Sequence, residues 1–579
     1  MPKTALCRSI CALGALCLFL IVPVRLNARP DGDDAPTTTP IKHAVVIFQE
    51  NVSFDHYFGT YPFAANPPGE PAVHAKEDTP RVNNLLSSGL LTNNPNGVDP
   101  FRIDRSVPNT CDQDHNYGDE QKAFHAGLMD NFLFDSCKDP VLGMNSTMGY
   151  YDGNTVTALW NYAQHFAMSD NHFGTTFGPS TPGLLNLVAG NTFEGTITNG
   201  LSGSGNIAGG ATMGAVVGDP DPAFDMCSNP KRTQISMSGD NIGNLLNAAN
   251  VTWGSFMGGF ANCAAKTTGL TGLHSSLDYI PHHAFFEYWQ STSNPNHLPP
   301  SSVANIGSQD QANHQYDLSS FAAALNAHNL PAVSLIKAPA FEDGHAGYSD
   351  PLDEQFFLVN FINALEKSEE WNETAVFITW DDSDGWYDHQ MGPINMQSNV
   401  SDLSNPASSD ADQLLGPGNC GTAKPIPGTT VIQNGRCGVG PRIPFLLVSP
   451  WAKQDYVDHR VIDQSSIIHF IEDNWKLGRI GNGSTDAQSG TVNGMFDFDD
   501  GPRAGKLFLD PMSGKVTDND DHDGRLTRKS EGRSEPQFRC RPALRTGRAL
   551  FFKPPMSGQS VGHCSNEVAR LLRLYSRTA

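Results

Sequence analysis

The stretch that decides the fold is Thr374-Ala-Val-Phe-Ile-Thr-Trp380, which leads directly into Asp381-Asp382-Ser-Asp-Gly-Trp-Tyr-Asp388-His389. A short apolar, β-branched run bounded by polar residues predicts a buried parallel strand. In an open α/β sheet, ligands bind just beyond the carboxyl ends of such strands. Adjacent carboxylates there repel each other unless a cation or protons neutralise them, and a hard divalent metal is the simplest cation. A solvated acidic loop is the alternative interpretation of an isolated acidic pair.

A second stretch repeats this arrangement near the start of the chain. Residues 43–48, His-Ala-Val-Val-Ile-Phe, predict another buried strand, and Glu50-Asn51 follow just past its end. Two strand ends therefore present four oxygen-donor side chains, Glu50, Asn51, Asp381 and Asp382. Such a donor set suits a hard or borderline cation, so we expect one divalent metal ion whose identity the sequence does not fix.

A serine lies at the predicted start of a helix. Phe177-Gly-Pro-Ser180-Thr181-Pro182 leads into an apolar helical stretch, with Pro182 suited to the first turn and Ser180 or Thr181 to the N-cap. Ser180 is therefore either a cap or a nucleophile whose attacked phosphate lies against the positive end of the helix dipole. No G-x-S-x-G sequence surrounds it, which disfavours an esterase of the α/β-hydrolase type.

Four histidines are further candidates. His115 precedes a predicted helix at 121–131, His282 and His283 are adjacent after a proline, and His345 follows a predicted strand at 332–336. Each alone is more often a structural residue than a functional one.

The bulk composition limits the functional classes. The chain has 579 residues and a formal net charge of −23, which argues against binding nucleic acid or adsorbing electrostatically to anionic lipid. Lys3 and Arg8 precede an apolar run at 10–24 that is short for a membrane span, and 26–28 resembles a cleavage site. We therefore expect a signal peptide at 1–28 and an exported, periplasmic or secreted protein without stable membrane insertion after cleavage; an uncleaved anchor is the alternative.

The domain organisation follows from the same reading. Residues 29–40 predict a linker, 41–501 a catalytic domain and 502–579 a C-terminal extension. Eight cysteines outside the signal suggest disulfides, and their order permits four local loops without fixing the pairing. Predicted strands alternate with helices such as 317–329 and 355–367, which indicates a mainly parallel sheet with helices on both faces. The expected fold is thus a three-layer α/β/α sandwich with long loop insertions.

Four ordered motifs resemble the bacterial phosphoesterase family, which contains secreted phospholipases C and broad-specificity acid phosphatases. They cover most of residues 41 to about 500 and are Glu50-Asn-Val-Ser-Phe-Asp-His-Tyr-Phe-Gly59, Phe177-Gly-Pro-Ser-Thr-Pro182, Ile378-Thr-Trp-Asp-Asp382 through Asp388-His389, and Gly440-Pro-Arg-Ile-Pro-Phe-Leu-Leu-Val-Ser-Pro-Trp451. The resemblance implies an alkaline-phosphatase-like fold. It also implies a metal-dependent phosphoric ester hydrolase.

The resemblance also assigns roles to individual residues. Glu50, Asn51, Asp381 and Asp382 match the metal ligands, although Asp382 stands where the family commonly has Glu. Ser180 matches the nucleophile, with its oxygen also on the metal. The four histidines match the lining of the phosphate pocket, with His115, His283 and His345 in catalysis and His282 in substrate binding. We expect protonated histidines and an acidic optimum.

Three functions remain open on the sequence. Broad phosphoester specificity of the acid-phosphatase kind is favoured, because the chain lacks the long C-terminal repeats of larger haemolytic members. A phospholipase C acting on phosphatidylcholine-type lipids is the first alternative, so the substrate is a phosphomonoester or a phospholipid headgroup. A secreted metal-binding protein without catalysis is the second.

Overall fold

An eight-stranded sheet lies at the centre of the molecule. The computed structural model describes residues 35–200, 205–402, 405, 408–425 and 432–517; the expected signal peptide, the start of the linker, Cys540 and Cys564 lie outside them. The strand order is β13-β10-β14-β1-β15-β16-β4-β17. These strands are β1 (His43–Gln49), β4 (Ala167–Ser169), β10 (Trp253–Met257), β13 (Gln315–Asp317), β14 (Val333–Lys337), β15 (Thr374–Trp380), β16 (Phe445–Val448) and β17 (Tyr456–Asp458).

The sheet is mainly parallel, as the sequence predicts. Every neighbouring pair runs parallel except the two that involve β16, which is antiparallel to both β15 and β4. All seven residues of β1 and all seven of β15 are buried, which explains their near-continuous apolar character.

The register of the three inner strands places functional side chains together. In β1, Gln49 pairs with Trp380 of β15, and Ile47 pairs with Ile336 of β14. Glu50 and Asp381 therefore leave the sheet from neighbouring positions, and Lys337 ends β14 on the other side of β1. Because all three strands are parallel, their carboxyl ends meet at one edge.

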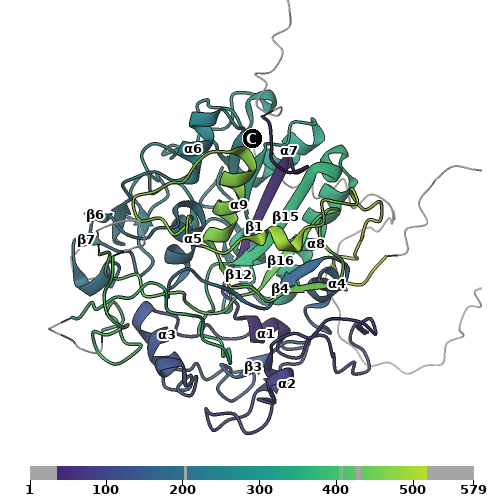
Figure 1. The fold of residues 1–579 in the computed structure, drawn as a ribbon, viewed down its shortest axis with the longest axis vertical. Coiled ribbons are helices and arrows are strands. Elements are labelled where there is room, and N and C mark those ends of the chain that lie inside the picture. Colours follow the sequence, from purple (N-terminus) through teal and green to yellow (C-terminus); the bar gives the residue numbers. More distant parts are fainter. Residues whose placement is uncertain (1–34, 201–204, 403–404, 406–407, 426–431, 518–579) are drawn as a thin grey trace, which may run out of the picture.

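Helices cover both faces of this sheet, which confirms the three-layer architecture. Figure 1 shows α5, α6 and α9 on one side of the sheet and α4, α7 and α8 on the other. The helices are α1 (Phe54–Phe58), α2 (Leu85–Ser88), α3 (Tyr117–Phe124), α4 (Thr157–His165), α5 (Ser180–Ala189), α6 (Ile242–Ala249), α7 (Leu318–Asn326), α8 (Pro351–Lys367) and α9 (Ser465–Trp475).

Two helix boundaries differ from expectation for local backbone reasons. The helix expected at 121–131 is α3, which ends early because His125 and Ala126 adopt left-handed φ values of 44° and 56°. The N-cap of α5 is Pro179, so the prediction of Ser180 or Thr181 as cap is wrong. Ser180 is the first helical residue, and its hydroxyl is free to point away from the helix.

Smaller sheets and three disulfides hold the insertions. Cys111–Cys137, Cys227–Cys263 and Cys420–Cys437 are joined, each within one local loop. A four-stranded sheet has the order β7-β6-β9-β8, and the remaining strands pair as β11-β12, β2-β3 and β18-β5. Their bounds are β2 (Phe101–Arg102), β3 (Gly149–Tyr150), β5 (His172–Phe173), β6 (Gly195–Asn199), β7 (Met213–Gly214), β8 (Asp221–Pro222), β9 (Gln234–Ser236), β11 (Lys266–Thr268), β12 (Ser275–Leu277) and β18 (Ile462–Asp463).

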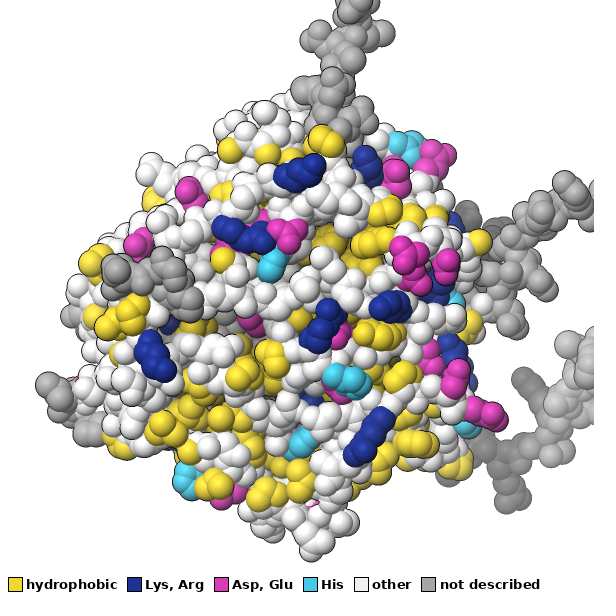
Figure 2. Space-filling model, viewed as in Figure 1, with side chains coloured by type: hydrophobic (Ala, Val, Ile, Leu, Met, Phe, Trp, Pro, Cys, Tyr) yellow, Lys and Arg dark blue, Asp and Glu magenta, His cyan; other side chains and the backbone are white. Residues whose placement is uncertain are grey.

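The described part of the C-terminal extension, residues 502–517, packs against the domain. Leu507 and Leu509 are buried in its main core, and their backbone amides donate to Glu366 and Asn363 of α8. Within the described ranges, none of the helices combines the length and apolar character needed to cross a membrane. On the face shown in Figure 2, the described basic side chains are scattered singly and form no continuous basic surface.

Candidate active site

Ser180 lies where the two predicted strand ends meet. It is 3% exposed, and its Oγ donates to Glu50 Oε2 at 3.0 Å. The same oxygen lies 3.4 Å from Asn51 Oδ1 and 3.4 Å from Asp382 Oδ2. A residue of α5 is thus brought onto side chains that follow β1 and β15.

The three carboxylates around this hydroxyl are buried and electrostatically unbalanced. Burial, reinforced by the nearby Asp381 charge, raises the pKa of both Glu50 and Asp382 well above its usual range. Burial opposes ionisation of Asp381 as well, but Lys337 and hydrogen bonds lower its pKa below the usual value. Asp381 Oδ1 accepts from the backbone amides of Asn51 at 2.9 Å and Asp382 at 2.8 Å.

Lys337 supplies a positive charge that the sequence reasoning missed. It is 1% exposed, and its ammonium group donates to Glu50 Oε1. His283 Nδ1 lies 3.2 Å from the same carboxylate oxygen. The sequence did contain a signal for this pairing, because a lysine ends the apolar strand. A charged residue at such a position is buried only when it has a partner.

The orientation of the Asn51 amide is informative about what the site holds. Burial lowers the pKa of His345 to about 4, so its ring is neutral near pH 7. Its Nδ1 donates to Ala346 O at 2.5 Å, which leaves Nε2 as an acceptor. The outer end of the amide, placed as the NH₂ group, lies 3.0 Å from that Nε2 and 3.3 Å from Nε2 of His115.

In this orientation the amide oxygen of Asn51 faces other acceptors. The inner end of the amide lies 2.8 Å from Glu50 Oε2 and 3.0 Å from Asp381 Oδ1. Without a cation the swapped orientation is favoured, because the NH₂ group then donates to Glu50 and Asp381 and the oxygen faces the His115 ring. A cation among these oxygens would favour the inward oxygen instead. Asn51 also has a left-handed φ of 53°, a conformation that asparagine tolerates and that is common at functional sites.

The five predicted ligands are therefore brought together and fit a divalent cation. Contacts of 3.4 Å or less link the oxygens of Glu50, Asn51, Ser180, Asp381 and Asp382 into one cluster. Carboxylate, amide and hydroxyl oxygens are the donors that hard cations prefer.

His115 lies beside this cluster and differs from the other histidines. Burial disfavours its charge, but Asp384 at 3.3 Å and Asp112 at 3.8 Å outweigh burial and raise its pKa to about 9. Its ring packs edge-on to His345, with ring centres 6.1 Å apart. His115 is thus an imidazolium at neutral pH and is able to donate a proton.

His283 departs from the expectation of a protonated set. Burial, with the Lys337 charge next, lowers the pKa of His283 well below 6.5. The ring of His282 packs edge-on to that of His283, and its Nδ1 faces Asp221 Oδ1 at 3.8 Å. The Thr181 hydroxyl donates to the backbone oxygen of His282 at 3.4 Å, and no hydrogen bond among the described residues joins the His282 side chain to Ser180.

Close packing fixes α5 against the end of β15. A Cβ atom built on Gly183 would lie 2.2 Å from the carbonyl oxygen of Asp381. In the first turn of α5, the Thr181 amide donates to Asp219 Oδ1 at 2.9 Å. Glycine at 183 therefore allows the approach that places Ser180 on the carboxylates.

An acidic cleft opens next to Ser180. It has a volume of about 490 Å³, and Pro179 and His115 form part of its wall. Four carboxylates also line it, those of Asp112, Asp114, Asp135 and Asp219. A ligand in this cleft would lie against Pro179, the residue before the nucleophile candidate, and among these carboxylates.

The family model of the Phosphoesterase family matches residues 41–478, and the chain belongs to this family. Over 441 residues it is 26% identical to a non-hemolytic phospholipase C of Pseudomonas aeruginosa, covering 75% of this chain and 53% of that one. Over 510 residues it is 24% identical to phospholipase C B of Mycobacterium tuberculosis, covering 85% and 84%. The chain thus spans about half the length of the Pseudomonas relative and most of the mycobacterial one.

Similarity to solved structures is weak. Murine ectonucleotide pyrophosphatase/phosphodiesterase 5 is 11% identical with a TM-score of 0.28, covering 59% of this chain and 95% of that one. A mutant of the alkaline phosphatase PafA is 9% identical with a TM-score of 0.29, covering 58% and 93%. At this level the comparison adds nothing to the fold described above.

Proposed function

We propose that this protein hydrolyses phosphoric esters through Ser180 and a divalent metal. The observation that carries the proposal is the position of Ser180 Oγ, 3.0 Å from Glu50 and 3.4 Å from Asp382, in the first turn of a helix. A hydroxyl placed there meets both an anion-binding helix start and a cation-binding oxygen cluster. Membership of the Phosphoesterase family supports the same reaction class.

The metal would be held by Glu50, Asn51, Ser180, Asp381 and Asp382. When bound, it would lower the pKa of the serine hydroxyl and withdraw charge from a phosphoryl oxygen. Ser180 Oγ then attacks phosphorus, the bond to the leaving oxygen breaks, and a phosphoserine forms.

Protonation of the leaving group falls to His115. Its pKa of about 9 keeps the ring charged below that pH, so it is able to give a proton to the departing alkoxide. Water next attacks the phosphoserine, releasing phosphate and restoring Ser180. His283 and His345 are neutral and act by orienting Glu50 and Asn51, which they contact.

Broad phosphomonoester specificity, of the acid-phosphatase kind, is the function that we infer for this site. The side chains gathered around Ser180 are groups that would bind a metal and a phosphoryl group, and they set no requirement on the leaving group. His282, beside His283 at the edge of the site, would bind substrate rather than take part in the chemistry.

A phospholipase C activity is the second candidate, and two observations favour it. The four carboxylates of the cleft would attract a cationic headgroup such as a choline ester and repel polyanions. Exposed apolar side chains also project from the segment that supplies Asp135 and Cys137 to the cleft wall: Leu128, Phe134, Val141 and Met144. Such a rim suits a lipid surface.

Export is part of the proposal. Three disulfides among the described residues fit an oxidising compartment, either the periplasm or the exterior.

The decisive experiment compares p-nitrophenyl phosphate with p-nitrophenylphosphorylcholine. Native protein and Ser180→Ala would be assayed with and without a chelator, and bound metal measured by elemental analysis. We expect hydrolysis that chelator abolishes and that Ser180→Ala lowers by at least 10³-fold. Preference for the choline ester would favour the phospholipase, full turnover by Ser180→Ala would exclude the phosphoserine, and bound metal without activity would leave a metal-binding protein.

A further inference from the structure

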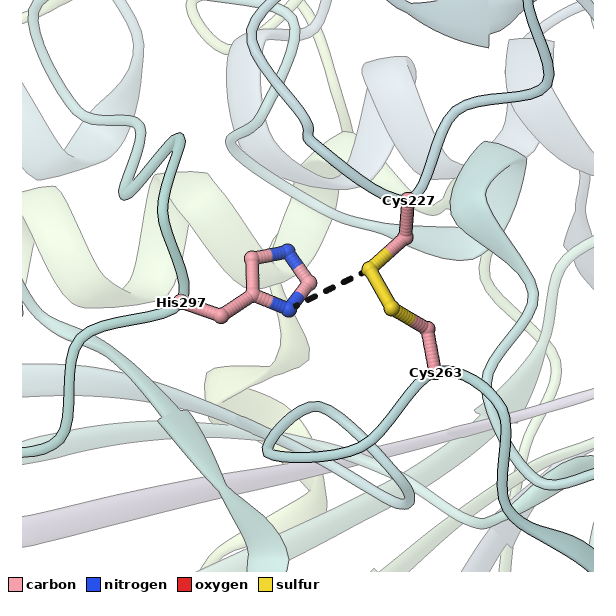
Figure 3. Close-up of side chains that lie close together, drawn as sticks. All are labelled: Cys227, Cys263 and His297. Atoms are coloured by element: carbon pink, nitrogen blue, oxygen red, sulfur yellow. Dashed lines mark hydrogen bonds between the residues drawn. A yellow bond between two sulfur atoms is a disulfide. The ribbon is translucent and has the colours of Figure 1, made fainter.

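A disulfide far from Ser180 in sequence lies against an imidazole ring. His297 Nδ1 is 3.6 Å from Cys227 Sγ in the Cys227–Cys263 disulfide, as Figure 3 shows. The ring stacks on Phe260 with centres 3.7 Å apart, which fixes its plane. Both cysteines are half-buried, whereas the His297 side chain is only 5% exposed.

The hydrogen-bond partners of this imidazole favour its positively charged form. Nδ1 of His297 lies 2.6 Å from Phe260 O, and Nε2 lies 3.0 Å from Asp225 Oδ1. Both ring nitrogens therefore face acceptors, which only the doubly protonated ring satisfies. Asp225 also accepts from the Cys227 amide at 2.6 Å and from Tyr279 Oη at 2.5 Å, an arrangement that suits its ionised form.

We propose that Cys227–Cys263 is a site of thiol–disulfide exchange, in which Cys263 is attacked and Cys227 is the leaving thiolate. An external thiolate would bond to Cys263 Sγ while the sulfur–sulfur bond breaks and its electron pair passes to Cys227 Sγ. The negative charge would form beside the His297 cation. Disulfide exchange is faster when the leaving thiolate is stabilised, and a neighbouring imidazolium provides this stabilisation.

The other described disulfides lack this arrangement. In Cys111–Cys137, the hydrogen-bonding neighbours of Cys111 Sγ are neutral, Ser146 Oγ at 3.6 Å and Gln113 Nε2 at 3.9 Å. Cys420 and Cys437 are fully buried, which closes that pair to external thiols. Among the described disulfides, burial thus excludes Cys420–Cys437, and the neighbouring charge distinguishes Cys227–Cys263 from Cys111–Cys137.

A short segment links this disulfide to the helix that carries Ser180. The chain runs from Asp219, which accepts from the first turn of α5, to Cys227 in eight residues. Tyr288 Oη holds this segment at Pro220 O, 2.9 Å away. Opening the disulfide would release one end of a segment whose other end holds the helix that carries Ser180.

Mass spectrometry tests the proposal directly, independently of any hydrolase activity. Purified oxidised protein would be treated briefly with reduced glutathione, alkylated with N-ethylmaleimide and digested. We expect glutathione on Cys263, the alkyl group on Cys227, and opening of this pair at least tenfold faster than Cys111–Cys137. Glutathione mainly on Cys227, or equal opening rates for the two pairs, would overturn it.

Two variants separate the chemistry from simple exposure. His297→Gln should slow opening of Cys227–Cys263 about tenfold and leave Cys111–Cys137 unchanged, whereas His328→Gln at an exposed site should alter neither. Asp225→Asn keeps the side-chain shape but removes the partner charge, so it should also slow the reaction. Unchanged exchange in Asp225→Asn and in a folded His297→Gln protein would contradict the role of the imidazolium.

Discussion

Gly183 and the carbonyl oxygen of Asp381 approach so closely that a Cβ at position 183 would lie 2.2 Å from that oxygen. This contact connects the helix that carries Ser180 with the strand end that carries the carboxylates. Because the obstacle is backbone, it has no flexible side chain to move aside, and α5 itself would have to shift.

Gly183→Ala should therefore reduce activity without changing a side chain of the site. We expect kcat on p-nitrophenyl phosphate to fall at least tenfold, since small displacements of a nucleophile are costly, and stability to fall by about 1–3 kcal/mol. Gly505→Ala is the matched control, because a Cβ there meets nothing within 4 Å. A Gly183→Ala enzyme with native kcat would show that the contact does not position Ser180.

Lys337→Met should destabilise the metal-free protein strongly and the metal-bound protein less. Removing one partner of a buried ion pair costs about 3–5 kcal/mol, because an uncompensated charge is left behind. A divalent cation would offset the same carboxylates, so adding metal should recover much of the loss. Thermal denaturation with chelator and with excess metal measures both effects, and Lys266→Met, at an exposed position, is the control. Equal losses of stability with chelator and with excess metal would show that Lys337 and the metal do not neutralise the same carboxylates.

His115→Asn should affect substrates according to their leaving groups. If His115 protonates the departing oxygen, kcat for an alkyl ester such as β-glycerophosphate should fall by about 10²-fold or more. Hydrolysis of p-nitrophenyl phosphate should fall less, since its leaving group needs little protonation.

The pH profile gives a second readout for the same residue. The acid form of His115 is present below its pKa of about 9, so native activity on the alkyl ester should decline above that pH. This decline should be absent in His115→Asn. An identical alkaline limb in both proteins would assign it to another group.

His56 should make the folded protein less stable as the pH falls. Burial lowers its pKa to about 3, although its Nδ1 donates to Gly149 O at 2.8 Å. Between about pH 6.5 and 3 the unfolded chain binds the proton and the folded chain does not, so stability is lost as pH falls. The contribution is about 1.4 kcal/mol per pH unit within that window.

His56→Gln removes this titration and should flatten the dependence of unfolding free energy on pH between 6 and 4 by about that slope. His125→Gln, whose side chain is exposed, serves as the control. Chemical denaturation at several pH values measures the slopes, and parallel curves for native and His56→Gln proteins would contradict the assignment.

The sequence predicted the inner strands well because each strand is marked by its own short apolar run. A run such as 374–380 carries its own burial signal, and parallel pairing then requires Asp381 to emerge beside Glu50. The antiparallel direction of β16 could not be predicted, since its apolar residues are compatible with either direction. The early end of α3 depends on left-handed residues at 125 and 126, which no periodicity reveals.

The site was predicted in its oxygen ligands but not in its charge balance. The carboxylates follow their strands directly in the sequence and are visible there. The pairing of Lys337 with Glu50 joins residues 287 apart, so the sequence does not reveal it. The raised pKa of His115 likewise depends on Asp384, which approaches only in three dimensions. Protonation states arise from such neighbours and from burial, so the expectation of several charged histidines failed for His283 and His345.

The β1–β15 pairing also determines when the oxygen cluster comes into existence. Asn51 and Asp381 are separated by 330 residues, and they meet only when β1 and β15, which are neighbours in the central sheet, have paired. Closing so long a loop is a late and slow event in folding. A chain that is still being synthesised, or is still unfolded during translocation, therefore lacks the assembled oxygen cluster. A cation bound by that cluster would be acquired in the compartment where folding finishes.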